Sequence, residues 1–167
     1  MLTNHRRLGL IIAAAIFVVD QATKAYVTGP LHLDYEGAVH YLLPFFQFTL
    51  THNEGIALGL FAAGSETQRW VLTAILACIT AGVAWWLWGE KLKGDAIGLA
   101  FVLGGALGNL TDRARFGYVI DFMDLHFGEF RPFLVFNVAD AAITVGVLIL
   151  LARALFVREG EPKPKES

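Results

Sequence analysis

The stretch NVADAAITVGVLILLARALFV, residues 137–157, decides the fold class of this chain. Between Asp140 and Arg153 it holds only uncharged and mostly apolar residues. A helix that crosses a membrane needs roughly 20 predominantly apolar residues. Residues 137–157 therefore predict a transmembrane helix, with two polar side chains, Asn137 and Asp140, at its start.

Three further stretches have the same character, namely residues 8–27, 70–89 and 96–113. The third is free of polar side chains only as far as residue 108, so a spanning helix there has to include the polar segment that follows. Hydrophobic residues make up 56% of the 167 residues and charged residues only 17%, whereas soluble domains carry about 25% charged residues. We therefore predict an α-helical membrane protein with four transmembrane helices.

The spans form one integral membrane domain over residues 1–157, and we expect the Pro-, Lys- and Glu-rich residues 158–167 to be a disordered cytoplasmic tail. Four spans place both termini on the same side. That side, with the turn at residues 90–95, holds 8 of the 13 Lys and Arg residues, so the positive-inside rule makes it cytoplasmic. These eight are Arg6, Arg7, Lys91, Lys93, Arg153, Arg158, Lys163 and Lys165. The net charge of −2 argues against a nucleic-acid partner.

Two segments on the opposite, outer side have the pattern of strands. Residues 39–50 are aromatic and β-branched and alternate after Pro44, which is typical of a β-strand. Residues 119–124, after Gly117, suggest a second extended piece. We expect a small β element at the outer membrane surface.

The inventory of reactive side chains excludes several kinds of catalysis. Of the two serines, Ser65 has no lysine or histidine within sequence reach and Ser167 lies at the terminus, while Cys78 lies in the middle of a span. The five histidines are scattered without the spacing of a metal site, so we expect no metal and no cofactor. Carboxylates remain, since 10 of the 15 acidic residues fall on the outer side or at the outer ends of spans.

Two pairs of polar residues allow both a functional and a structural interpretation. Asp20 and Lys24 lie four residues apart on one helix face, either as part of a site or as an interfacial pair with Lys24 extended to the membrane surface. Asn137 and Asp140 suit the N-cap and third positions of a helix, so their role is either capping or catalysis.

Seven polar residues map to the outer interface under this topology, which favours a functional site. They are Asp20, Asn53, Asn109, Arg113, Asp121, Asn137 and Asp140. Two carboxylates from separate segments that share one proton can serve as base and acid, as in aspartic peptidases. The alternative is a proton-coupled membrane carrier with an Asp relay. A carrier would need polar groups through the whole membrane, but residues 8–19 and 143–151 are nearly all apolar.

Five motifs in order resemble those of the signal peptidase II (lipoprotein signal peptidase) family, over about residues 8–156. They are DQATK at 20–24, NEGIA at 53–57, GGALGNLTDR at 104–113, GYVIDF at 117–122 and FNVAD at 136–140. The resemblance implies a small extracytoplasmic β-cradle and a short surface helix beside the four spans. It also implies an aspartic endopeptidase of the bacterial inner membrane that cuts diacylglyceryl-modified prolipoproteins on the N-terminal side of the lipidated cysteine.

The same resemblance assigns roles to individual residues. Asp121 and Asp140 would be the catalytic pair, while the nearby Asp112 and Asp124 would be structural. The supporting polar shell would comprise Asp20, Lys24, Asn53, Gly55, Asn109, Arg113 and Asn137. Membrane lipid and peptide antibiotics such as globomycin would be further binding partners. Leu58 departs from the aromatic residue common at its position, which affects loop contacts and not the catalytic pair.

Overall fold

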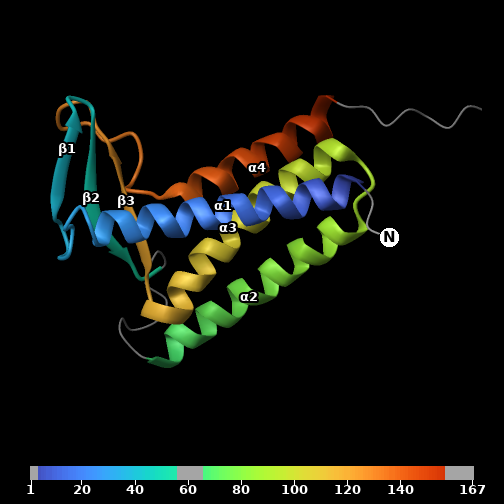
Figure 1. The fold of residues 1–167 in the computed structure, drawn as a ribbon, viewed down its shortest axis with the longest axis horizontal. Coiled ribbons are helices and arrows are strands. Elements are labelled where there is room, and N and C mark those ends of the chain that lie inside the picture. Colours follow the sequence, from blue (N-terminus) through green and yellow to red (C-terminus); the bar gives the residue numbers. More distant parts are fainter. Residues whose placement is uncertain (1–3, 56–65, 157–167) are drawn as a thin grey trace, which may run out of the picture.

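A computed structural model describes residues 4–55 and 66–156 of the chain and contains four long helices (Figure 1). They are α1 (Asn4–Thr28), α2 (Glu66–Gly89), α3 (Lys93–Phe116) and α4 (Val138–Phe156). Each is long and apolar enough to cross a membrane. The four predicted spans are therefore confirmed, and α3 extends three residues beyond the predicted residue 113. It ends where Gly117 adopts a left-handed conformation with φ of 91°, which glycine accepts without steric cost.

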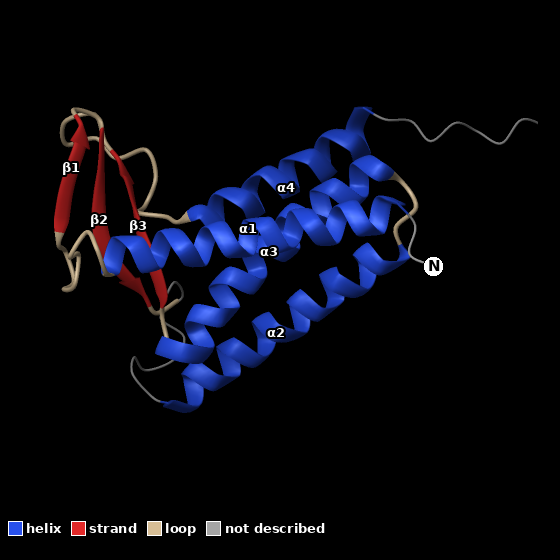
Figure 2. Ribbon diagram, viewed as in Figure 1, coloured by secondary structure: helices blue, strands red, loops and turns tan. Residues whose placement is uncertain are grey.

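A small antiparallel sheet lies across the end of the bundle that is far from the N-terminus (Figure 2). Its strands β1 (Val39–Leu43), β2 (Phe46–Asn53) and β3 (Val119–Leu125) pair in the order β1-β2-β3. The extended segments predicted at 39–50 and 119–124 are thus confirmed, but the first is a hairpin and not one strand. Pro44 lies at the hairpin turn, because proline lacks the N–H that a ladder needs and has a φ suited to turns.

Helix α3 lies at the centre of the bundle, and its glycines allow the neighbouring backbones to come close. A Cβ on Gly104 would lie 2.7 Å from the carbonyl oxygen of Ala13 in α1, and one on Gly146 of α4 would lie 2.6 Å from that of Gly98. Small residues at such crossings are typical of packed membrane helices. These two close contacts fix the positions of α1, α3 and α4 along one another, and with them the depth of their polar residues.

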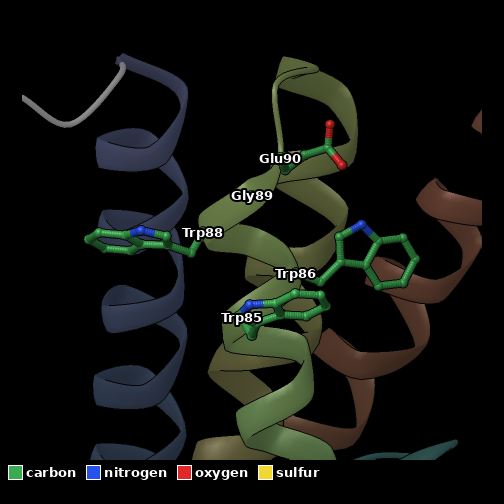
Figure 3. Close-up of a pocket in the computed structure, with 5 residues that line it drawn as sticks. All are labelled: Trp85, Trp86, Trp88, Gly89 and Glu90. Atoms are coloured by element: carbon green, nitrogen blue, oxygen red, sulfur yellow. The ribbon is translucent and has the colours of Figure 1, made fainter.

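Tryptophans lie near both ends of α2. Trp70 lies at its sheet-side end, and Trp85, Trp86 and Trp88 line a shallow pocket of about 300 Å³ at the other end, where Trp88 points toward α1 (Figure 3). Tryptophan is enriched at both membrane interfaces. The 18-residue rise from Trp70 to Trp88 is about 27 Å, close to the roughly 30 Å of a hydrocarbon core.

The short surface helix implied by the family resemblance does not occur within residues 4–55 and 66–156. Leu58, Ser65 and the predicted tail at 158–167 lie outside the described residues.

Candidate active site

Asp121 lies on β3, faces the helices, and is 2% exposed. The antiparallel register pairs Thr51 with Asp121 and Asn53 with Val119, so that Asn53 and Asp121 are diagonal neighbours. The side-chain amide of Asn53 donates to Oδ2 of Asp121 at 3.0 Å, and the amide of Asn137 donates to Oδ1 at 2.6 Å. Both oxygens of this buried carboxyl group therefore have a hydrogen-bond donor.

Asp140 lies in the first turn of α4 and is only partly buried. Its Oδ1 accepts a hydrogen bond of 2.7 Å from the side-chain amide of Asn109, and its Oδ2 accepts one of 3.3 Å from the backbone N–H of Asn137. The backbone N–H of Asp140 in turn donates to Oδ1 of Asn137 at 2.8 Å. This reciprocal pair caps the helix, so the capping interpretation of the sequence is confirmed.

Asn137 contacts both carboxyl groups and has no solvent exposure. Its side-chain nitrogen lies 2.6 Å from Asp121, 3.1 Å from Oδ1 of Asn109 and 3.2 Å from the carbonyl oxygen of Ile120. One residue therefore joins β3, α3 and the start of α4. Capping and alignment of the two aspartates do not compete, because the capping hydrogen bonds themselves hold Asp140 while the side-chain nitrogen of Asn137 holds Asp121.

Burial and, to a lesser extent, the negative charge of Asp140 raise the pKa of Asp121 from 3.8 to about 7. Hydrogen bonds from Asn53 and Asn137 act in the opposite direction but are outweighed. A carboxyl group that holds its proton near neutral pH beside a second carboxyl group is the arrangement in which two acids share one proton.

A buried cluster of charges joins α1 to α3 and α4 just inside the aspartate pair. Lys24 is 2% exposed, and its ammonium group lies 2.8 Å from Oδ2 of Asp20 and 2.7 Å from Oδ2 of Asp112. The alternative with Lys24 extended to the membrane surface is therefore wrong, because Asp112 on α3 offers a second carboxylate inside the bundle. Oδ1 of Asp20 accepts a hydrogen bond of 2.9 Å from the N–H of Ala139, one of the donors that the start of α4 leaves free.

Lys24 also determines how the amide of Asn109 is turned. Its ammonium group donates to Oδ1 of Asn109 at 3.2 Å, and the same oxygen accepts from Asn137. The nitrogen of the Asn109 amide is thereby left to donate to Asp140. Lys24 thus acts on Asp140 through Asn109, without touching it.

Arg113 and Gly55 support the other side of the pair. Arg113 is 9% exposed and donates through Nη1 to the carbonyl oxygen of Asn53 at 3.3 Å. Gly55 has a φ of 78°, and a Cβ there would lie 3.1 Å from Nη1 of Arg113, so a side chain would be excluded both by strain and by space. The N–H of Gly55 donates to Oδ1 of Asn53 at 2.9 Å, which turns the nitrogen of that amide toward Asp121.

Asp124 points away from this cluster. Its carboxylate accepts hydrogen bonds from Gln47, Thr49 and Arg131 at 2.8–3.1 Å. Burial favours the neutral form of Asp124, but these three hydrogen bonds outweigh it and lower the pKa. This acid ties the sheet to the segment after β3, as its predicted structural role requires.

The nine residues that sequence analysis singled out all belong to one hydrogen-bonded network. The residue it missed is Gln21, whose amide donates to Asp112 at 2.9 Å and lies within 3.3 Å of Asp20 and the carbonyl oxygen of Gly108. The feature of the sequence that could have identified Gln21 is its position directly after Asp20 in the motif DQATK. The network as a whole places a buried carboxyl group, Asp121, near a partly exposed one, Asp140, and two such acids are the groups that acid–base hydrolysis uses.

Comparison with known proteins identifies the family. The family model for signal peptidase (SPase) II matches residues 12–156. The chain belongs to the signal peptidase II family. Its members are aspartic peptidases.

Named relatives of this signal peptidase II cover nearly its whole length. The lipoprotein signal peptidase of Sphingopyxis alaskensis is 55% identical over 93% of the chain and 89% of the relative. That of Rhizorhabdus wittichii is 51% identical over 93% of the chain and 90% of the relative. A solved bacterial membrane enzyme, 25% identical, superposes with a TM-score of 0.73 over 90% of this chain and 94% of the other. The fold predicted for signal peptidase II is thereby confirmed.

Proposed function

We propose that Asp121 and Asp140 are the catalytic pair of this signal peptidase II. The observation that carries the proposal is the contact of one buried residue, Asn137, with both carboxyl groups. An asparagine in this position brings two acids from separate segments to one depth. The raised pKa of Asp121 supports the same assignment.

In the proposed mechanism the two acids have different resting states. Asp121, with a pKa of about 7, holds the proton. Asp140, at the N-terminus of α4, is the base. Asp140 takes a proton from water as its oxygen attacks the scissile carbonyl carbon, and Asp121 gives its proton to the carbonyl oxygen. Collapse of the tetrahedral intermediate breaks the C–N bond, returns the hydroxyl proton to Asp121, and passes the proton held by Asp140 to the leaving amine.

The remaining network residues are proposed to position the pair. Asn53, Asn109 and Asn137 hold the two carboxyl groups by hydrogen bonds. Asp20 and Lys24 hold the start of α4 and the amide of Asn109. Arg113 and Gly55 hold Asn53 in place.

The substrates we propose are lipid-modified prolipoproteins, cut on the N-terminal side of the modified cysteine. The relatives named lipoprotein signal peptidase support this class. A signal peptide spans the membrane as a helix, so its end meets the enzyme at the depth of Asp140. We also propose that membrane lipid surrounds the spans and that the peptide antibiotic globomycin inhibits the enzyme at this site.

We further propose that the protein is a single peptidase domain of the bacterial inner membrane, with the sheet outside and both termini in the cytoplasm. The excess of basic residues on the terminal side supports this orientation, 8 of 13 against 5.

The test is cleavage of a diacylglyceryl-modified precursor by purified protein in detergent. We expect the modified precursor to be cut and the unmodified one to be cut poorly or not at all, since each buried CH₂ adds roughly 0.8 kcal/mol to docking. Equal cleavage of both would contradict the substrate class. Proton flux through proteoliposomes without any proteolysis would instead support the carrier.

A further inference from the structure

Six large apolar side chains project from one end of the sheet, and we call this group the apolar rim. Leu43 and Phe45 come from the β1–β2 hairpin, and the others come from the segment between β3 and α4. Phe130 is 66% exposed and Leu134 is 90% exposed. The full rim consists of Leu43, Phe45, Phe127, Phe130, Phe133 and Leu134.

The fold holds the rim in this exposed position. The rings of Phe45 and Phe127 stack with centroids 6.5 Å apart, and the N–H of His126 donates to the carbonyl oxygen of Phe45 at 3.0 Å. Phe127 and Phe130 exchange two backbone hydrogen bonds across a tight turn. Arg131 bonds to the buried Asp124 at 3.1 Å. The rim is therefore an ordered surface whose apolar side chains are held in an exposed position by these contacts.

The rim leads directly into the start of α4. Its last residue, Leu134, lies three positions before Asn137, the cap of α4. The exposed side chains of this helix include Val145 and Leu148. Figure 1 shows that the end of the sheet with the β1–β2 hairpin extends sideways past the first turn of α4. The rim thus continues along the chain into a helix whose exposed side chains are also apolar.

We propose that the apolar rim inserts into the bilayer leaflet on the sheet side. Contiguous exposed apolar groups of this size mark a binding surface, and continuity with α4 selects lipid as the occupant. The half-exposed Arg131, placed between Phe130 and Phe133, suits the phosphate groups at the same depth. Insertion fixes the sheet, and with it Asp121, at a set distance from the membrane. This inference rests on the four spans and is independent of the peptidase activity.

Spin labels on the full-length protein test the depth of the rim. Cys78 is replaced by alanine, and single cysteines are introduced by Phe130→Cys, Leu134→Cys and, as a control, Asp34→Cys in the exposed connection after α1. The labelled proteins are reconstituted into vesicles of phosphatidylethanolamine and phosphatidylglycerol. Collision rates with oxygen and with a polar nickel complex are then measured by electron paramagnetic resonance.

Because oxygen concentrates in hydrocarbon and the nickel complex is excluded from it, we expect the ratio of the two collision rates at positions 130 and 134 to be about tenfold higher than at position 34. A ratio equal to that at position 34 would overturn the proposal, since the rim would then lie in water. Protection from both reagents with spin–spin broadening would also overturn it, because a second copy of the chain would then cover the rim.

Discussion

Asn137 and Asp140 bond to each other in both directions, through the Asp140 N–H to Oδ1 of Asn137 at 2.8 Å and the Asn137 N–H to Oδ2 of Asp140 at 3.3 Å. The hydrogen bond from the Asn137 N–H therefore both caps α4 and holds Oδ2 of Asp140 in place. The amide nitrogen of Asn137 remains available for Asp121. Helix initiation and alignment of the acids are two functions of one asparagine.

Loss of either carboxyl group should abolish cleavage. Asp121→Asn and Asp140→Asn are each expected to lower the cleavage rate at least about a hundredfold, because each removes one member of an acid–base pair. Asp124→Asn, whose partners lie on the other side of the sheet, is the matched control and should retain cleavage. Turnover by Asp121→Asn or Asp140→Asn, or loss of it in Asp124→Asn, would show that the wrong acids have been chosen.

Two substitutions of Asn137 separate its functions. Asn137→Ala removes the cap and should lower the free energy of unfolding by about 1 kcal/mol or more, at all pH values. Asn137→Asp keeps the cap but places a carboxyl group beside Asp121. Its stability should therefore be retained at acidic pH and fall as pH rises, since two adjacent carboxyl groups cannot both ionise. Thermal melting followed by tryptophan fluorescence between pH 4 and pH 8 checks both expectations.

The alkaline limit of activity should follow the proton on Asp121. With its pKa raised to about 7 by burial and by Asp140, cleavage should decline as pH rises through about 7 and the proton is lost. Asn53→Ala removes a hydrogen bond that lowers this pKa, so the alkaline limit should move upward. Activity should also fall in acid, where both carboxyl groups are protonated. A pH–rate profile whose alkaline limit is unchanged in Asn53→Ala would contradict the assignment.

The raised pKa of Asp121 also has a consequence for stability. Since the folded pKa lies above the ordinary 3.8, the folded state holds this proton more tightly. The contribution of this proton to the free energy of unfolding is fully present below the ordinary pKa of 3.8 and is lost as pH rises toward about 7. Asp121→Asn should therefore flatten the pH dependence of the melting temperature over this range, whereas Asp124→Asn should not.

Lys24 should be needed for folding more than for the chemistry. Lys24→Met leaves Asp20 and Asp112 buried without their cation, a change that costs about 3–5 kcal/mol in buried ion pairs. Neutralising both acids in the same protein, by Asp20→Asn and Asp112→Asn, should recover much of the melting temperature. If the single variant melts like the parent protein, the cluster does not stabilise the bundle.

The proposed orientation predicts which ends of α2 and α3 an external reagent reaches. In a Cys78→Ala background, Glu66→Cys at the sheet-side end of α2 should react with a membrane-impermeant thiol reagent in intact cells, and Lys93→Cys should not. Lys93→Cys should become reactive after the cells are opened. The reverse pattern would place the aspartate pair on the cytoplasmic side.

The spans and the level of the polar residues could be predicted from sequence because both depend on local hydropathy and on helix length. The burial of Lys24 could not, since it depends on Asp112, which lies far along the chain and reaches Lys24 only when α1 packs on α3. The same holds for Gln21. Capping and catalysis at Asn137 and Asp140 looked like rival interpretations because a sequence does not show which atom of Asn137 makes each contact.

Asp121 comes from the sheet, whereas Asp140 and Asn109 come from the bundle. The pair therefore exists only while the sheet is docked. Because the helices pack mainly on one another, we expect the four spans to stay folded when the sheet is not docked. Local opening of a small element requires less free energy than global unfolding. Hydrolysis should accordingly stop at the temperature at which the sheet undocks. A protein that has lost its activity on heating should remain in the membrane and regain the activity when the three strands dock again on the bundle.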